Sequence, residues 1–283
     1  MGLTMEMHYI RRGTGPPLLL IHGLGSTWRS WLPILDALAA EREVTAVDLP
    51  GFGDSPPLAQ EPSITALADS ITAFMATHGL TGADLVGSSM GARLVLELAR
   101  RGATGTVVAL DPGGFWSPWQ LRYFETTLKL SIRLVRALQP VMPALTKHAI
   151  GRTLLLSQLS ARPWDLPPGL ALDEMRSYAA SPSFDGALNQ LIYGPVQQGA
   201  DSTHGQVIIG WGRKDRVCFP SQARRALQLF PGAQLHWFED CGHFPQWDVP
   251  AAASRLILSG TDRSKPLAGD RAASEPAQGI ARH

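Results

Sequence analysis

Cysteine is scarce in this chain of 283 residues, which contains only Cys218 and Cys241. Two cysteines are too few for the disulfide framework of a small secreted domain, or for a zinc site built on several thiolates. We therefore expect two free thiols, a cytoplasmic location where thiols stay reduced, and no bound metal.

Excess charge and long apolar runs are also missing. The 25 Lys and Arg residues balance the 24 Asp and Glu residues, for a formal net charge of +1. Without a basic stripe carrying interleaved aromatic residues, nucleic acid is not an expected partner. No apolar run has the length of a membrane span, and residues 1–6 lack the charged and apolar segments of a signal peptide. The expected partner is a small-molecule substrate, and the sequence leaves the oligomeric state open.

What the sequence does contain is a regular alternation of short apolar runs with helical patterns. Runs that are apolar on both faces are typical of parallel strands covered by helices. This predicts an α/β fold with a mostly parallel, doubly wound sheet and right-handed crossovers. The predicted strands cover residues 5–11, 18–21, 44–49, 83–86, 106–110, 207–210 and 234–238.

The alternation stops between residues 112 and 200, where only helical stretches are found, at 119–138, 144–159, 170–180 and 184–197. Helical patterns this regular are not expected of a loop. We therefore predict that residues 112–200 form a helical cap, inserted into a core made of 1–111 and 201–260. Residues 261–283 are polar and unpatterned, which predicts a disordered tail.

One motif organises the candidate site: Gly87-Ser88-Ser89-Met90-Gly91, between a predicted strand and a predicted helix. A sharp strand-to-helix turn strains its central residue and lifts the Ser89 hydroxyl clear of the sheet. The five letters alone would fit an ordinary glycine-rich turn equally well. A serine hydroxyl also needs a neighbouring base before it becomes a useful nucleophile at neutral pH.

Two loops supply the partners that such a serine requires. Asp215 and His243 each follow a predicted strand, in the order serine, acid, histidine. Because the carboxyl ends of parallel strands share one edge of a sheet, the three side chains are expected to meet. We predict Ser89 as nucleophile, His243 as base and Asp215 as acid, although Asp111 also ends a strand and stays open as the acid.

The segment His22-Gly23-Leu24-Gly25 follows a buried strand, where exposed N–H groups can bind an oxyanion. The N–H groups of Leu24 and Met90 are the predicted oxyanion hole, and His22 is expected to shape the loop. This chemistry needs no metal and no organic cofactor. The candidate pocket residues are aromatic and follow the strand predicted at 106–110, next to the turn that carries Ser89. They would equally suit packing between the cap and the core. They are Phe115, Trp116 and Trp119.

Taken together, these segments resemble the α/β-hydrolase-fold superfamily, in its capped members with a serine nucleophile, up to Gly260. The segments around Asp215 and His243 are similar to those of meta-cleavage product hydrolases, which split carbon–carbon bonds. That group usually has Asn where this chain has Ser88, so we favour a carboxylesterase-like enzyme. The resemblance implies hydrolysis of a small or medium, largely apolar ester through an acyl-enzyme. Carbon–carbon hydrolysis and a non-catalytic small-molecule sensor are the alternatives.

Overall fold

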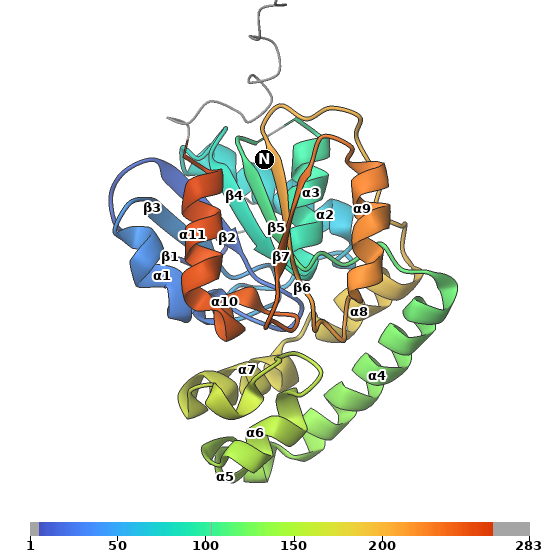
Figure 1. Ribbon diagram of the computed structural model, residues 1–283. Helices are drawn as coiled ribbons and strands as arrows, with labels where there is room; N and C mark the ends of the chain where they lie inside the picture. The colour runs from blue at the N-terminus through green and yellow to red at the C-terminus, as the bar shows by residue number, and fades with distance from the viewer. Residues whose placement is uncertain (1–5, 103, 263–283) are drawn as a thin grey trace, which may run out of the picture.

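A seven-stranded sheet organises the computed structural model, which describes residues 6–102 and 104–262 (Figure 1). The strand order is β1-β3-β2-β4-β5-β6-β7; β1 runs antiparallel to β3, and every other pair is parallel. The predicted fold class is therefore confirmed. The strands are β1 (Tyr9–Arg12), β2 (Pro17–Ile21), β3 (Glu43–Val47), β4 (Asp84–Ser88), β5 (Val107–Leu110), β6 (Val207–Gly212) and β7 (Gln234–Phe238).

Helices cover both faces of this sheet because its five inner strands are buried on both sides. In β2, Leu18 and Leu20 pack in one core cluster while Leu19 and Ile21 pack in another, as the two-residue period of a strand requires. The first face is covered by α1 (Leu32–Ala39) and α11 (Pro250–Gly260); the second by α2 (Ile64–Thr77), α3 (Met90–Arg100) and α9 (Ala223–Leu229). Short elements complete the core: η1 (Trp28–Trp31), η4 (Pro220–Gln222) and α10 (Pro245–Asp248).

Between β5 and β6 the chain forms the cap helices, α4 to α8, which lie beyond the end of the sheet where α10 follows β7 (Figure 1). They are α4 (Pro118–Ala137), α5 (Met142–Lys147), α6 (Ala149–Leu156), α7 (Pro168–Ala180) and α8 (Phe184–Tyr193), with η2 (Gln139–Val141) and η3 (Pro163–Asp165) between them.

Two predicted cap helices differ from those observed. The helix expected over 144–159 is divided into α5 and α6, because His148 is extended and α6 turns back on α5. Gly151 allows that contact, since a Cβ there would lie 2.0 Å from the carbonyl oxygen of Leu145. The helix expected to reach 197 ends at Tyr193, because the extended Gly194 precedes Pro195.

The chain end was also partly mispredicted. Thr261, expected to begin a disordered tail, is buried at the end of α11, where its hydroxyl oxygen accepts a hydrogen bond from Arg42 at 2.6 Å. Arg42 in turn pairs with Asp84 at 3.1 Å, which ties this end to β4. The rest of the predicted tail, from residue 263, lies outside the described residues. Within the described ranges, none of the helices is both long and apolar enough to cross a membrane.

The turn between β4 and α3 depends on unusually close backbone contacts. A Cβ on Gly91 would lie 2.1 Å from the carbonyl oxygen of Ile21, and a Cβ on Gly87 would lie 2.2 Å from that of Gly91. No side chain fits in such a space, so both glycines are sterically required. They let α3 start directly against β2 and β4, which places the intervening Ser89 at the sheet edge.

Gly91→Ala should therefore destabilise the fold, by about 1–3 kcal/mol if the backbone shifts as in other overpacked cores. Gly169 offers a matched control, because it is also the second residue of a helix, but a Cβ added there would meet no described neighbour within 4 Å. Gly169→Ala should be neutral, or stabilising by up to about 1 kcal/mol through helix propensity. Urea unfolding measures both, and a Gly91→Ala protein as stable as Gly169→Ala would contradict the packing argument.

Candidate active site

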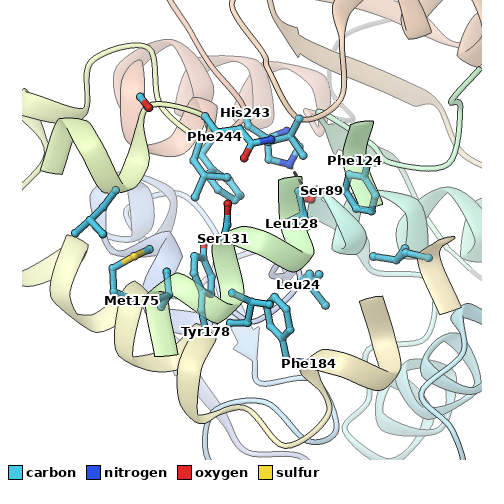
Figure 2. Close-up of a pocket in the computed structure, with 18 of the residues that line it drawn as sticks. Leu24, Ser89, Phe124, Leu128, Ser131, Met175, Tyr178, Phe184, His243 and Phe244 are labelled. Atoms are coloured by element: carbon cyan, nitrogen blue, oxygen red, sulfur yellow. Dashed lines mark hydrogen bonds between the residues drawn. The ribbon is translucent and has the colours of Figure 1, made fainter. Parts of the chain in front are cut away.

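Ser89 occupies a strained turn at the carboxyl end of β4. Its backbone has φ +57° and ψ −115°, and its N–H donates to the carbonyl of Leu110 at 2.9 Å. A positive φ is costly for a residue with a side chain and persists only where the surroundings enforce it. The expected strain is present, and the half-buried Ser89 hydroxyl faces a cavity (Figure 2).

Three loops bring Ser89, His243 and Asp215 into one chain of hydrogen bonds. Nε2 of His243 lies 2.8 Å from the Ser89 hydroxyl oxygen, and Nδ1 lies 2.8 Å from the Asp215 carboxylate. The other carboxylate oxygen of Asp215 accepts from the N–H groups of Val217 and Cys218, at 2.7 and 2.9 Å. The oxygen of Asp215 that faces His243 accepts a hydrogen bond from Nδ1, which leaves Nε2 free to accept from the Ser89 hydroxyl.

Asp111, the rival acid, does not reach His243 by any hydrogen bond within the described residues. Its carboxylate accepts instead from the N–H of Gly212 at 2.8 Å, beneath Asp215. Burial, followed by the negative charge of Asp215, raises the pKa of Asp111 well above its usual range and favours the neutral form. Of the two acids that the sequence left open, the structure brings Asp215 to the histidine.

A metal ion would compete with these contacts. Asp215, Cys218 and His243 are close enough for one ligand atom each to lie within 4.8 Å of the others. The carboxylate and imidazole already bond to each other, however. Burial also raises the pKa of the Cys218 thiol well above its usual range, which disfavours the thiolate that metals bind. This group therefore fits a hydrogen-bonded triad better than a metal site.

The loop after β2 lies directly against Ser89. A Cβ on Gly23 would come within 3.1 Å of the Ser89 Cβ. His22 holds this loop as expected, because its Nδ1 donates to the Gly23 carbonyl at 2.7 Å and its Nε2 accepts from the N–H of Leu49 at 2.9 Å. Burial lowers the pKa of His22 and keeps it in this neutral form.

The two N–H groups predicted to bind an oxyanion come from this loop and from the start of α3. Within the described residues, the N–H of Leu24 and that of Met90 donate no backbone hydrogen bond outside regular elements. Leu24 also contributes to the wall of the cavity beside Ser89 (Figure 2). Both donors are thus available to an oxygen atom held near the Ser89 hydroxyl.

The cavity above Ser89 has a volume of about 220 Å³ and is largely apolar. One wall comes from α4, where Phe124, Leu128, Ile132 and Val135 repeat at helical spacing. Met175, Tyr178 and Phe184 of α7 and α8 contribute further walls (Figure 2), and the polar contributors are Ser131, Ser157 and Gln158. No described lining residue carries a Lys, Arg, Asp or Glu side chain.

The pocket prediction named the wrong aromatic residues. Phe115, Trp116 and Trp119 are not among the described residues that line the cavity. Trp119 is 56% exposed and packs on Phe219, while Trp116 packs behind the lining residue Phe124, with ring centroids 4.8 Å apart. The reason is geometric: α4 begins at residue 118 and its cavity-facing side starts only at residue 124. The apolar spacing along α4 could have identified the correct residues.

Asp248 is a site residue that the sequence did not reveal. Its carboxylate accepts from the N–H of Gly242 at 2.7 Å, the N–H of Ala161 at 2.8 Å, and the hydroxyl of Ser160. The N–H of His243 itself donates to the carbonyl of Leu159 at 2.8 Å. Cap residues 159–161 thus hold the histidine loop in place, through contacts that join segments more than eighty residues apart and leave no local pattern.

Comparison with known proteins agrees with the family resemblance seen in the sequence. The Alpha/beta hydrolase family matches this chain over residues 18–256. An uncharacterized protein of Mycobacterium tuberculosis is 27% identical, over 92% of this chain and 80% of its own length. The 2-hydroxy-6-oxo-6-phenylhexa-2,4-dienoate hydrolase of Burkholderia cepacia is 24% identical, over 89% of this chain and 90% of its own length.

Among solved structures, a thermophilic esterase from Thermogutta terrifontis superimposes with a TM-score of 0.71 at 20% identity, over 90% of this chain and 92% of that one. At this identity the likeness concerns the fold. The family match covers most of the chain, from β2 into α11, and includes the segments that carry Ser89, Asp215 and His243. This chain belongs to the alpha/beta hydrolase family.

Proposed function

We propose that this protein is a serine hydrolase that cleaves a small or medium, largely apolar carboxylic ester. The observation that carries the proposal is the continuous set of hydrogen bonds from Asp215 through His243 to Ser89, opening on an apolar cavity. The same three side chains, in the same relation, activate serine in unrelated hydrolases.

In the proposed reaction, the Ser89 oxygen attacks the ester carbonyl while Nε2 of His243 takes the hydroxyl proton. The resulting oxyanion is bound by the N–H groups of Leu24 and Met90. His243 then gives its proton to the departing alcohol, leaving an acyl-enzyme on Ser89. Water activated by His243 releases the acid, and Asp215 stabilises the imidazolium in both steps.

The cavity supports a neutral, apolar substrate. Its walls offer Leu, Ile, Val, Met and Phe side chains, and the polar groups among the described lining residues are serine hydroxyls, Gln158, the Tyr178 phenol and the His243 imidazole. Because no described lining residue is a Lys or Arg, a substrate carboxylate would enter without a cation to replace its hydration. Cap helices on one side and the sheet edge on the other would both contact the substrate.

Carbon–carbon bond hydrolysis is the second candidate, since the relative from Burkholderia cepacia is named as the hydrolase of a 2-hydroxy-6-oxo-dienoate, the kind of compound on which that reaction would be tested. Its substrate is a dienoate and carries a carboxylate, which the lining described above does not match. Ser88 would also need to serve where the meta-cleavage group has Asn. Its hydroxyl accepts from Gln246 at 3.2 Å and lies fully buried, outside the residues that line the cavity.

A non-catalytic sensor on the same fold is the alternative from another class. A sensor needs the cavity but not an aligned base. The 2.8 Å contacts on both imidazole nitrogens favour an enzyme, because they serve proton transfer, which a sensor does not need. Turnover of any short ester that depends on Ser89 would exclude a sensor.

Ser89→Ala should lower esterase activity by roughly 10³-fold or more while the fold remains intact, because only the nucleophile is lost. Initial rates on p-nitrophenyl esters of increasing chain length measure this. The neighbouring Ser88→Ala is the matched control: it removes a hydroxyl bonded to Gln246 and should retain most activity. A Ser89→Ala protein with near-native turnover would remove Ser89 from the mechanism.

Asp215→Asn should cost far more activity than Asp111→Asn. An amide at residue 215 favours the wrong imidazole tautomer, an effect of about 10⁴ in serine proteases. At residue 111 an amide resembles the neutral carboxyl that burial already favours, so little should change. Comparing kcat for the two variants tests the assignment, and the opposite ranking would make Asp111 the acid.

The enzyme should prefer esters to carbon–carbon bonds. We expect kcat/KM for the best p-nitrophenyl ester to exceed that for a 2-hydroxy-6-oxo-dienoate, because the described cavity wall holds no cation for the dienoate carboxylate. Both substrates should be assayed side by side, with Ser89→Ala as the blank. A higher kcat/KM for the dienoate would reverse the order of the two candidate functions.

A further inference from the structure

One face of the cap helix α7 is bonded to the turn that carries Leu24. Glu174 and Ser177 follow the spacing i, i+3, which places them on the same side of the helix, and Ser181 is the first residue after it. Glu174 accepts from the Ser26 hydroxyl at 3.0 Å, and the Ser177 hydroxyl donates to the Gly25 carbonyl at 2.6 Å. Ser181 adds a longer bond, 3.4 Å, to the same carbonyl.

The turn is also closely packed beneath the cap. Gly25 has φ +76°, and a Cβ added there would lie 2.7 Å from ring atoms of Tyr178 and of Phe184. Both rings line the cavity together with Leu24 (Figure 2). The cap therefore touches the oxyanion-binding turn with both polar and aromatic side chains, and the position of the Leu24 peptide depends on them.

Glu174 is the most unusual member of this contact, since its side chain is only 2% exposed. Leucine or methionine would cover the turn without the cost of burying a carboxyl group. What Glu174 supplies is an acceptor for Ser26, two residues beyond Leu24. We propose that Glu174 is a positioning residue, which holds residues 23–26 so that the Leu24 N–H points at the oxyanion formed on Ser89. The inference rests on the proposed function.

The carboxyl should act in its neutral form. Burial raises the pKa of Glu174 to about 8, while hydrogen bonds from Ser26 and Tyr178 oppose the shift and the charge of Asp173 adds to it. The other described elements packed on α7, which are α4, α5, η1 and η2, contribute no charge to this shift. Glu174 thus keeps its proton below about pH 8 and loses it above, where a carboxylate would oppose the developing oxyanion.

Oxyanion-hole donors act only at short range, and losing one costs about 10²–10³ in kcat. A displaced donor should cost less than a missing one, so we expect Glu174→Ala to lower kcat about tenfold with KM little changed. Ser26→Ala removes the same bond from the other side and should have a similar effect. The double variant should be no worse than Glu174→Ala alone, because that change already removes the acceptor of the Ser26 hydroxyl.

The conservative Glu174→Gln keeps the acceptor for Ser26 and cannot ionise. It should restore most of the kcat lost in Glu174→Ala, and it should lack the fall in kcat that we expect of the wild type as pH rises through about 8. Glu125→Ala is the matched control for loss of a cap carboxyl, since Glu125 pairs with Lys129 on α4, away from the turn. That control should leave kcat unchanged.

The experiment measures kcat and KM for these variants with the best p-nitrophenyl ester, across neutral to alkaline pH. The amide resonances of Leu24 and Gly25, recorded by NMR in wild type and Glu174→Ala, report the turn without requiring turnover. We expect Glu174→Ala to lose kcat, to show no additive effect with Ser26→Ala, and to shift the Leu24 and Gly25 resonances. Additive effects, unchanged kcat in both single variants, unchanged resonances or an alkaline fall retained in Glu174→Gln would overturn the proposal. A wild type inactive on every ester would instead contradict the proposed function, and the resonances would still decide the role of Glu174.

Discussion

Close approach of backbone segments at one edge of the sheet is the constraint on which the site depends. Gly87 and Gly91 let α3 begin against β2 and β4, and the strained Ser89 lies between them. A similar close contact joins the loops after β6 and β7, where a Cβ on Gly212 would lie 2.0 Å from the carbonyl oxygen of Gly242. Three loops can meet within hydrogen-bond distance only because these positions carry no side chain.

The cap does more than cover the cavity. Residues 159–161 hold the histidine loop, directly and through Asp248, while α7 holds the turn that carries Leu24. Two of the loops that would perform the chemistry are therefore stabilised by the cap as well as by the sheet. A substrate between cap and sheet would lie between the side chains that bind it and the loops that would act on it.

Buried acids around the site differ in the hydrogen bonds that they accept. Asp215 accepts two backbone N–H bonds besides that of His243, and Asp248 accepts two backbone N–H bonds and one from a hydroxyl. Burial raises the pKa of Asp111, and that of Glu174 to about 8, so both favour the neutral form near neutral pH. The two acids that hold His243 and its loop are thus those that accept three of the described hydrogen bonds each.

Residue patterns were sufficient for the architecture and for naming Ser89 and His243 as candidates, with Asp215 and Asp111 as rival acids, because apolar runs, glycine turns and strand ends are local features. Choosing Asp215 over Asp111 required coordinates, since both residues end strands and only distance separates them. The cavity wall on α4 was misassigned because the sequence does not fix where a helix begins to face the cavity. Asp248 and Glu174 were missed altogether. Their partners, Ser160 with Ala161 and Ser26, lie 87 or more residues away in the chain, so only the packing of cap on core decided what these two carboxyl groups contact.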